Sequence, residues 1–503
     1  MGGNVAYRRS RIPFRYALAV IPLLGGALWG CALNPPPSAD EIRSQTLAHA
    51  ELPPKWKAPG AAEGAVVDGW LATFNDASLR ALVEEALVHN ADLRVAATRV
   101  EQAGGYLKVA GASLYPAVTA LGRAGGKLSG DNSGLTGILV SASWEIDLWG
   151  RVRYGRAAAT QQYASALSDF EYGRQSLAAM VAKSWFLATE AKQQKETAAQ
   201  IVTSAEQLLN IARQRLRVGA GNELDVAVAQ ANLDGYRDTL RQLELAYEQS
   251  LRALELLLGR YPAAAMEASG KLDLMPPPVP AGLPSELLER RPDVVAAERR
   301  VAAAFDRVGE AKAAMLPKIS LTAGVSSVSS DLFVLKDHNN PVWSAGANLL
   351  APIYQGGALR AQVEIRTSEQ KQALAEYAQA GLRAFGEVEN ALATEFTLKD
   401  RQTILMNAVT DNERALELAN VQYRVGSVDL RSVSQQQLAL FAARSALIRV
   451  QSEARVQRVN LYLALGGSFK KSEEEKKTED GTQSNLAPPS PTEETTGSGK
   501  TTN

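Results

Sequence analysis

Few residues in this sequence have the type and spacing that acid–base or metal chemistry requires. The three histidines of the chain are His49, His89 and His338. None of them has a second candidate ligand at metal-binding spacing, so no metal site is expected. Glu145 and Asp147 could act as a pair of catalytic carboxylates. Residues two apart on a strand share a face, however, and exposure of that face to water explains both.

Phosphate chemistry is also not indicated. Gly356-Gly357 is not followed by the Lys-Ser/Thr pair of a phosphate-binding loop, and a bend between a strand and a helix explains it. The 503 residues carry 54 basic and 54 acidic side chains, so the chain lacks the excess of positive charge that is typical of nucleic-acid binding. We therefore predict no enzyme, no catalytic residue and no nucleic-acid partner.

The N-terminus has the pattern of a processed lipoprotein leader. Four arginines between positions 8 and 15 precede an apolar stretch, 16–28, which leads into Leu28-Trp29-Gly30-Cys31. This tetrapeptide resembles the lipobox of bacterial lipoproteins, which implies a covalent diacylglycerol and an N-acyl lipid on Cys31 and no other cofactor. Ala32 after the cysteine favours release to the outer membrane. An uncleaved anchor or an ordinary signal peptide is the alternative.

Two similar stretches organise the rest of the chain. Arg217-Val218-Gly219 and Arg424-Val425-Gly426 each follow about seventy residues without proline and precede about thirty-five helical residues. Glycine is the usual residue where a helix stops. Gly219 and Gly426 are therefore expected at the tips of helical hairpins whose first arm is about 100 Å long.

Alternating residues predict four strands, at about 116–124, 138–149, 317–326 and 342–353. In the second, apolar residues from Val140 to Leu148 alternate with polar residues from Ser141 to Asp147, as in a barrel with lipid outside and water within. An amphipathic hairpin on a soluble core is the alternative. No window after Cys31 has eighteen consecutive apolar residues, so crossing a bilayer would require strands.

The chain contains an internal duplication. Asn90-Ala91-Asp92 corresponds to Arg291-Pro292-Asp293, 201 residues later, and Leu258-Gly259 corresponds to Leu465-Gly466, 207 residues later. The expected parts are a signal peptide 1–30, a lipidated extended strap 31–66, a first repeat 67–260, a linker 261–283, a second repeat 284–467 and a disordered tail 468–503. Four strands are too few for a membrane barrel, which needs about eight, so chains must share one.

The sequence from about Trp70 to Gly467 resembles the TolC-like outer membrane efflux proteins, in the lipoprotein branch that includes NodT and OprM. The most specific stretch is Leu287–Leu321, LLERRPDVVAAERRVAAAFDRVGEAKAAMLPKISL. Trp70 with Phe74-Asn75-Asp76, the octapeptide Trp144–Arg151 and the two hairpin tips support the resemblance.

This resemblance implies a mostly helical fold with a small β part. An antiparallel α-helical barrel would form a periplasmic tunnel, and the four strands of each chain would contribute to a trimeric, 12-stranded barrel in the outer membrane of a Gram-negative bacterium. The implied partners are two further copies of the chain, outer-membrane lipid, a periplasmic membrane-fusion adaptor and an inner-membrane pump of RND type, with ABC type as the alternative.

The resemblance also implies a gate at the hairpin tips. The expected gate residues are Asp225, Tyr423, Arg424, Asp429, Arg431, Ser432 and Gln435. Ser432 and Gln435 stand where the best-known relatives carry aspartates, which argues against an acidic, cation-binding ring. A gate built from Arg, Ser and Gln hydrogen bonds is the hypothesis that remains.

The function expected from these features is passive export, with the chain as the outer membrane duct of a tripartite efflux system. The alternative is a non-conducting, elongated coiled-coil lipoprotein with a structural or adhesive role. A soluble periplasmic enzyme is a third hypothesis. It is disfavoured because the sequence lacks a set of polar residues that could form an active site. The alternating strands discriminate between the first two, because a spacer needs no barrel.

Overall fold

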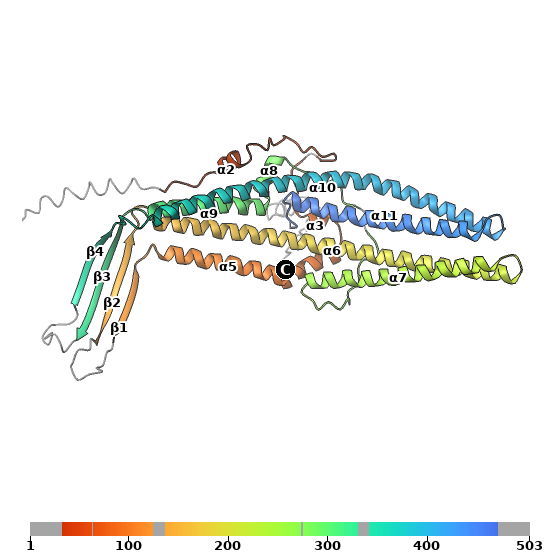
Figure 1. The fold of residues 1–503 in the computed structure, drawn as a ribbon, viewed down its shortest axis with the longest axis horizontal. Coiled ribbons are helices and arrows are strands. Elements are labelled where there is room, and N and C mark those ends of the chain that lie inside the picture. Colours follow the sequence, from red (N-terminus) through yellow and green to blue (C-terminus); the bar gives the residue numbers. More distant parts are fainter. Residues whose placement is uncertain (1–32, 63, 124–135, 273–274, 330–341, 471–503) are drawn as a thin grey trace, which may run out of the picture. The chain divides into compact units, whose positions relative to one another are not determined.

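The computed structural model describes residues 33–470 except 63, 124–135, 273–274 and 330–341 (Figure 1). Cys31, the expected lipidation site, lies outside the described residues, as do His338, the signal peptide 1–30 and residues 471–503 of the tail.

The predicted fold class, mostly helical with four strands, is confirmed. The helices are α2 Ala39–Thr46, α3 Trp70–Thr73, α4 Ala77–His89, α5 Ala91–Ala112, α6 Arg151–Arg217, α7 Glu223–Leu257, α8 Pro284–Arg290, α9 Pro292–Ala313, α10 Ala358–Arg424 and α11 Leu430–Ala464. The strands are β1 Ala117–Arg123, β2 Thr136–Ile146, β3 Lys318–Ser329 and β4 Val342–Leu350. The two long helices, α6 and α10, have 67 residues each, and the helices that follow them have 35 each.

Both repeats carry a helix break at the same place. Asn90 separates α4 from α5, and Arg291 separates α8 from α9. Pro292 occupies the first position of α9, where its missing N–H costs nothing. The Asn90 amide instead donates to the carbonyl of Leu257, at 3.0 Å. The duplication thus preserves the break with different residues.

The strands form one antiparallel sheet in the order β1-β2-β3-β4 (Figure 1). Cross-strand partners share a face, and two adjacent apolar rows are Val118–Ala142–Ala323–Ala345 and Ala120–Val140–Val325–Trp343. The row between them faces the other way and is Thr119–Ser141–Gly324–Ser344. Leu121, Leu139 and Leu350 interrupt the polar face. The predicted two-faced pattern is therefore present across all four strands.

Strand β2 ends three residues before the predicted boundary at 149, because Asp147 caps the next helix. Its carboxylate accepts the backbone N–H groups of Val152 and Arg153, at 3.1 and 2.9 Å. Glu145 pairs with Arg151 through two bonds of 2.9 and 2.7 Å. These two carboxylates therefore build a strand-to-helix turn. Strand β4 likewise ends at Leu350 and not at 353, just before Pro352, which cannot donate to a ladder.

The strap and the tail also differ from expectation. The strap was expected to be extended, but Ser38 and Glu41 form a capping box that starts α2, and Ile42 is buried. The tail was expected to begin at 468. The backbone N–H of Ser468 instead donates to the Asp68 carboxylate, at 2.8 Å, and Phe469 is buried.

The chain divides into two compact units. One comprises Met1–Leu52, Ala91–Gly173 and Arg291–Phe385, and the other Pro53–Asn90, Arg174–Arg290 and Gly386–Asn503. The first unit contains the sheet, and the second contains both hairpin tips.

One aromatic cluster of the second unit is built around Trp70. Its ring stacks on Tyr462 with 5.8 Å between centroids and meets Phe74 edge-on. Asp76 caps α4 with one carboxylate oxygen and accepts the indole N–H of Trp185 with the other, at 2.7 Å. The Phe74-Asn75-Asp76 motif thus fixes α4 against α6.

In the described part of the chain, no helix combines the length and apolar character that a membrane-spanning helix needs.

Candidate functional site

The hairpin tips stand on a shared hydrophobic core. It joins α6, α7, α10 and α11 and is made of buried residues: Ile201, Ala205, Leu208, Leu209, Ala212, Ala229, Leu233, Tyr236, Ala419, Tyr423, Leu430 and Val433. Alanines make up four of these positions, so the helices approach closely. The tips of both hairpins therefore share one core.

Each long helix ends in the same way. Gly219 and Gly426 have φ values of 76° and 83°, a left-handed backbone that glycine adopts at low cost. The N–H of Ala220 reaches back to the carbonyl of Arg215, and that of Ser427 to the carbonyl of Gln422, both at 2.9 Å. These are Schellman turns, which satisfy the last carbonyls of the helix. The repeated Arg-Val-Gly triplet therefore encodes a helix stop.

The return helices begin at matching caps. Asn222 caps α7 by accepting the N–H of Asp225, at 2.8 Å. Asp429 caps α11 by accepting the N–H and the hydroxyl of Ser432, at 2.9 and 2.6 Å. The Ser432 hydrogen bonds hold the pKa of Asp429 below its ordinary value. Asp429 and Ser432, both expected in the gate, are thus bonded to each other within one turn.

Arg215 links the two hairpins. Its guanidinium lies 4.7 Å from the centre of the Tyr423 ring and donates to the Tyr423 carbonyl. A second nitrogen donates to the carbonyl of Ala220, at 3.1 Å. Within the described residues, the buried Arg215 Nε and the Tyr423 hydroxyl have no hydrogen-bond partner. Burial, and then the charge of Asp225, raises the pKa of Tyr423. Arg215 thus contacts Tyr423 directly, and Asp225 lies close enough for its charge to act on the Tyr423 hydroxyl.

Arg215 was not among the expected gate residues. The signal that could have revealed it is a difference between the repeats. Four residues before the tip glycine, the first repeat has Arg215 and the second has Gln422; one residue later, they have Leu216 and Tyr423. The contact pair therefore occupies adjacent positions where the duplication has diverged.

Three other expected gate residues take no part in this contact. Arg424, Arg431 and Gln435 are exposed, and in the described part of the chain none of their side chains has a hydrogen bond or ion pair. The described residues also contain no group of three metal-ligating side chains. The Arg, Ser and Gln gate stays a prediction.

An ion pair joins the two arms of each hairpin, at equivalent positions in the two repeats. Arg237 on α7 meets Glu206 on α6 at 2.8 Å, and Arg444 on α11 meets Glu413 on α10 at 2.6 Å. Both members of the second pair lie 207 residues after those of the first. Because these side chains are substantially exposed, each pair contributes less than about 1 kcal/mol.

Comparisons with known proteins agree over both repeats. A family model described as outer membrane efflux protein matches residues 82–260 and 283–467. The chain is 32% identical over 472 residues to the cation efflux system protein CusC of Escherichia coli O6:H1, covering 91% of this chain and 98% of CusC. It is 32% identical over 441 residues to the pyoverdine export outer membrane protein OpmQ of Pseudomonas aeruginosa, covering 83% of this chain and 91% of OpmQ.

Among solved structures, the CmeC outer membrane channel of Campylobacter jejuni superimposes with a TM-score of 0.76 at 25% identity. The superposition covers 85% of this chain and 95% of CmeC.

Proposed function

The chain belongs to the outer membrane efflux protein family, and from this premise we propose that it is the passive, gated duct of a tripartite efflux system. It is the outer membrane channel component, which extends into the periplasm. A pump in the inner membrane would drive transport, and a periplasmic membrane-fusion adaptor would join the pump to this chain. RND-type pumps fit this role, with ABC-type pumps as the alternative.

The two-faced sheet is the observation that carries the proposal. Two complete rows of apolar residues cross all four strands on one face, and a row without large apolar side chains lies between them on the other. That arrangement suits a surface with lipid on one side and water on the other. The non-conducting spacer of the alternative reading has no use for it.

The edges of the sheet support a homotrimer. In the described part of the chain, β1 and β4 each pair with one neighbour only. Unpaired backbone groups are costly in lipid, so both edges need partner strands. Three chains, each with the four strands of one sheet, would supply a closed 12-stranded barrel.

Conductance tests this function directly. Purified wild-type protein in a planar bilayer should give discrete single-channel steps. Well-folded oligomers that insert but carry no current, in the wild type or in any tip variant, would instead favour the spacer.

We further propose that the hairpin tips form the gate. Asp225 beside Tyr423, and Ser432 with Gln435 on the first turns of α11, are the polar groups that a neighbouring hairpin could contact. The wild type should then show small conductance, and Asp225→Ala and the double variant Ser432→Gly with Gln435→Gly should each raise it. Large conductance that these changes leave unaltered would place the constriction elsewhere.

A further inference from the structure

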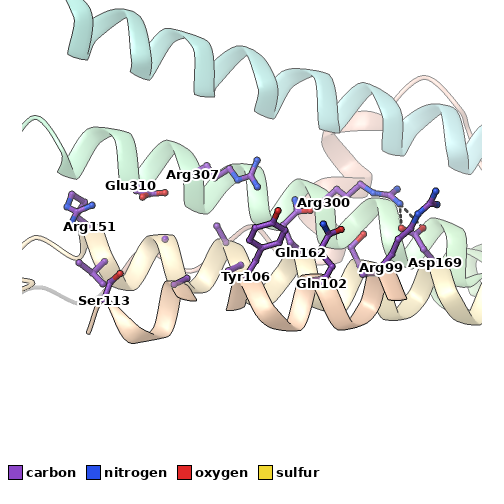
Figure 2. A pocket seen from close by; sticks show the side chains of 18 residues that line it. Arg99, Gln102, Tyr106, Ser113, Arg151, Gln162, Asp169, Arg300, Arg307 and Glu310 are labelled. Atoms are coloured by element: carbon purple, nitrogen blue, oxygen red, sulfur yellow. Dashed lines mark hydrogen bonds and ion pairs between the residues drawn. The ribbon is translucent and has the colours of Figure 1, made fainter. Parts of the chain in front are cut away.

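A groove on the first unit lies outside the tips and the strands. It runs over α5, α6 and α9 and has a volume of about 610 Å³ (Figure 2). Its lining residues recur at helical spacing on each helix, for example Arg99, Gln102 and Tyr106 on α5. One face of each of the three helices therefore contributes. The volume suits a small solute or a lipid headgroup.

Small residues on α6 leave room for the groove. Gly155, Ala158 and Ala159 of α6 form part of its floor. A Cβ added at Gly155 would lie 3.2 Å from a carboxylate oxygen of Glu310, so the floor is already close to α9. Larger side chains here would fill the groove.

The lining carries more positive than negative charge. Four arginines line it, with one aspartate and one glutamate. Two of the arginines are paired at the ends. Arg151 bonds to Glu145, and Arg300 bonds to both carboxylate oxygens of Asp169, at 2.6 and 2.5 Å. Glu310 offsets part of the positive charge, and the two lining arginines without an ion pair in the described part of the chain are Arg99 and Arg307.

Hydrogen-bond donors without partners gather between those ends. Figure 2 shows Tyr106, Gln102 and Gln162 between Arg307 and Arg99 along the groove. Within the described residues, none of these five side chains makes a hydrogen bond or an ion pair. Each of these two guanidinium groups can bind an oxyanion, because arginine binds carboxylate and phosphate with paired N–H groups. Hydroxyl and amide donors lie between them along the groove.

We propose that this groove binds oxyanionic groups, phosphate or carboxylate, at Arg99 and at Arg307. Such a group could belong to a dissolved solute on its way through the duct or to the headgroup of a phospholipid. Binding of a solute in transit rests on the proposed function, whereas binding of the oxyanion as such does not.

Titration with inorganic phosphate tests the binding. The full-length oligomer is titrated calorimetrically at constant ionic strength, with chloride as the reference anion. Arg99→Gln with Arg307→Gln should weaken phosphate binding by at least about tenfold, because each loses a charge-assisted hydrogen bond. The lysine pair at the same positions keeps the charge and should lose less, which separates binding from misfolding.

The chain offers a matched control. Arg94 on α5 and Arg156 on α6 are exposed and lie outside the groove lining. Arg94→Gln with Arg156→Gln removes the same charge and should leave phosphate affinity unchanged. Equal affinity in the groove and control variants, or a wild type that binds phosphate no better than chloride, would overturn the proposal.

Two further readouts identify the source. For a solute in the duct, the groove variant should shift the reversal potential in a salt gradient toward cations, while the control variant shifts it less. For a headgroup, the groove variant should retain less phospholipid phosphate through purification, with the reversal potential unchanged. A wild type that carries no current would refute the proposed channel function. The phosphate titration would still show whether the groove binds an oxyanion.

Discussion

At the scale of single residues, Arg215 is a side chain that joins the two hairpins near their tips. Its ring contact with Tyr423 and its hydrogen bond to the Tyr423 carbonyl depend on the guanidinium. Arg215→Gln, which introduces the residue found at the equivalent Gln422, should lose about 2 kcal/mol of tip stability. The looser tip should conduct more in a planar bilayer.

Arg213 provides the control for that change. It is exposed and bonds to Gln230 on the neighbouring arm of its own hairpin, at 2.9 Å. Arg213→Gln should therefore leave conductance near the wild-type value. Equal currents from both variants would show that Arg215 does not hold the hairpins together.

A second residue-scale effect concerns pH. Asp306 on α9 is only 2% exposed, and burial raises its pKa from 3.8 to about 6. The folded chain thus favours the protonated acid, whose stabilising effect is complete below the ordinary pKa and is lost as pH rises through about 6. Asp306→Asn cannot ionise. Its stability relative to the wild type should increase by about 2 kcal/mol between about pH 4.5 and about pH 8.

Unfolding curves of both proteins across that range provide the measurement. A difference between variant and wild type that stays constant with pH would mean that Asp306 ionises at its ordinary pKa in the folded chain.

At the scale of elements, two helix ends separate backbone strain from packing. Gly219 and Gly259 both have left-handed backbones, with φ of 76° and 74°. A Cβ at Gly219 would meet nothing within 4 Å, whereas one at Gly259 would lie 2.8 Å from the carbonyl oxygen of His89. Gly219→Ala should cost about 1–2 kcal/mol from strain, and Gly259→Ala about 3 kcal/mol or more because the end of α4 must shift as well.

Urea unfolding followed by circular dichroism compares the two variants. Similar midpoints would show that the end of α4 at His89 can shift without loss of stability. Backbone strain alone would then account for the destabilisation in both variants.

The sequence predicts elements that depend on local chemistry and misses contacts that depend on packing. The Arg-Val-Gly triplets, the alternating strands and the duplication are local or periodic, and they correspond to helix stops and a two-faced sheet. The capping box at Ser38 is equally local, yet it starts a helix where an extended strap is expected. The Arg215–Tyr423 contact joins residues 208 positions apart. It follows only from how four helices pack, which spacing along the chain does not encode.

At the scale of the whole molecule, neighbouring residues of one strand test whether the sheet faces lipid. Ala345 and Ser344 of β4 are both exposed in the chain and lie on opposite faces. Ala345→Arg places a charge on the apolar face and should cost about 2–4 kcal/mol near the bilayer midplane, which reduces the yield of inserted oligomer. Ser344→Arg adds the same charge on the other face, so oligomers should still insert, with altered single-channel conductance. The yield of membrane-extracted oligomer measures the first effect and planar-bilayer recording the second. If both variants insert equally well, the apolar face does not contact lipid, and the proposed duct loses its principal support.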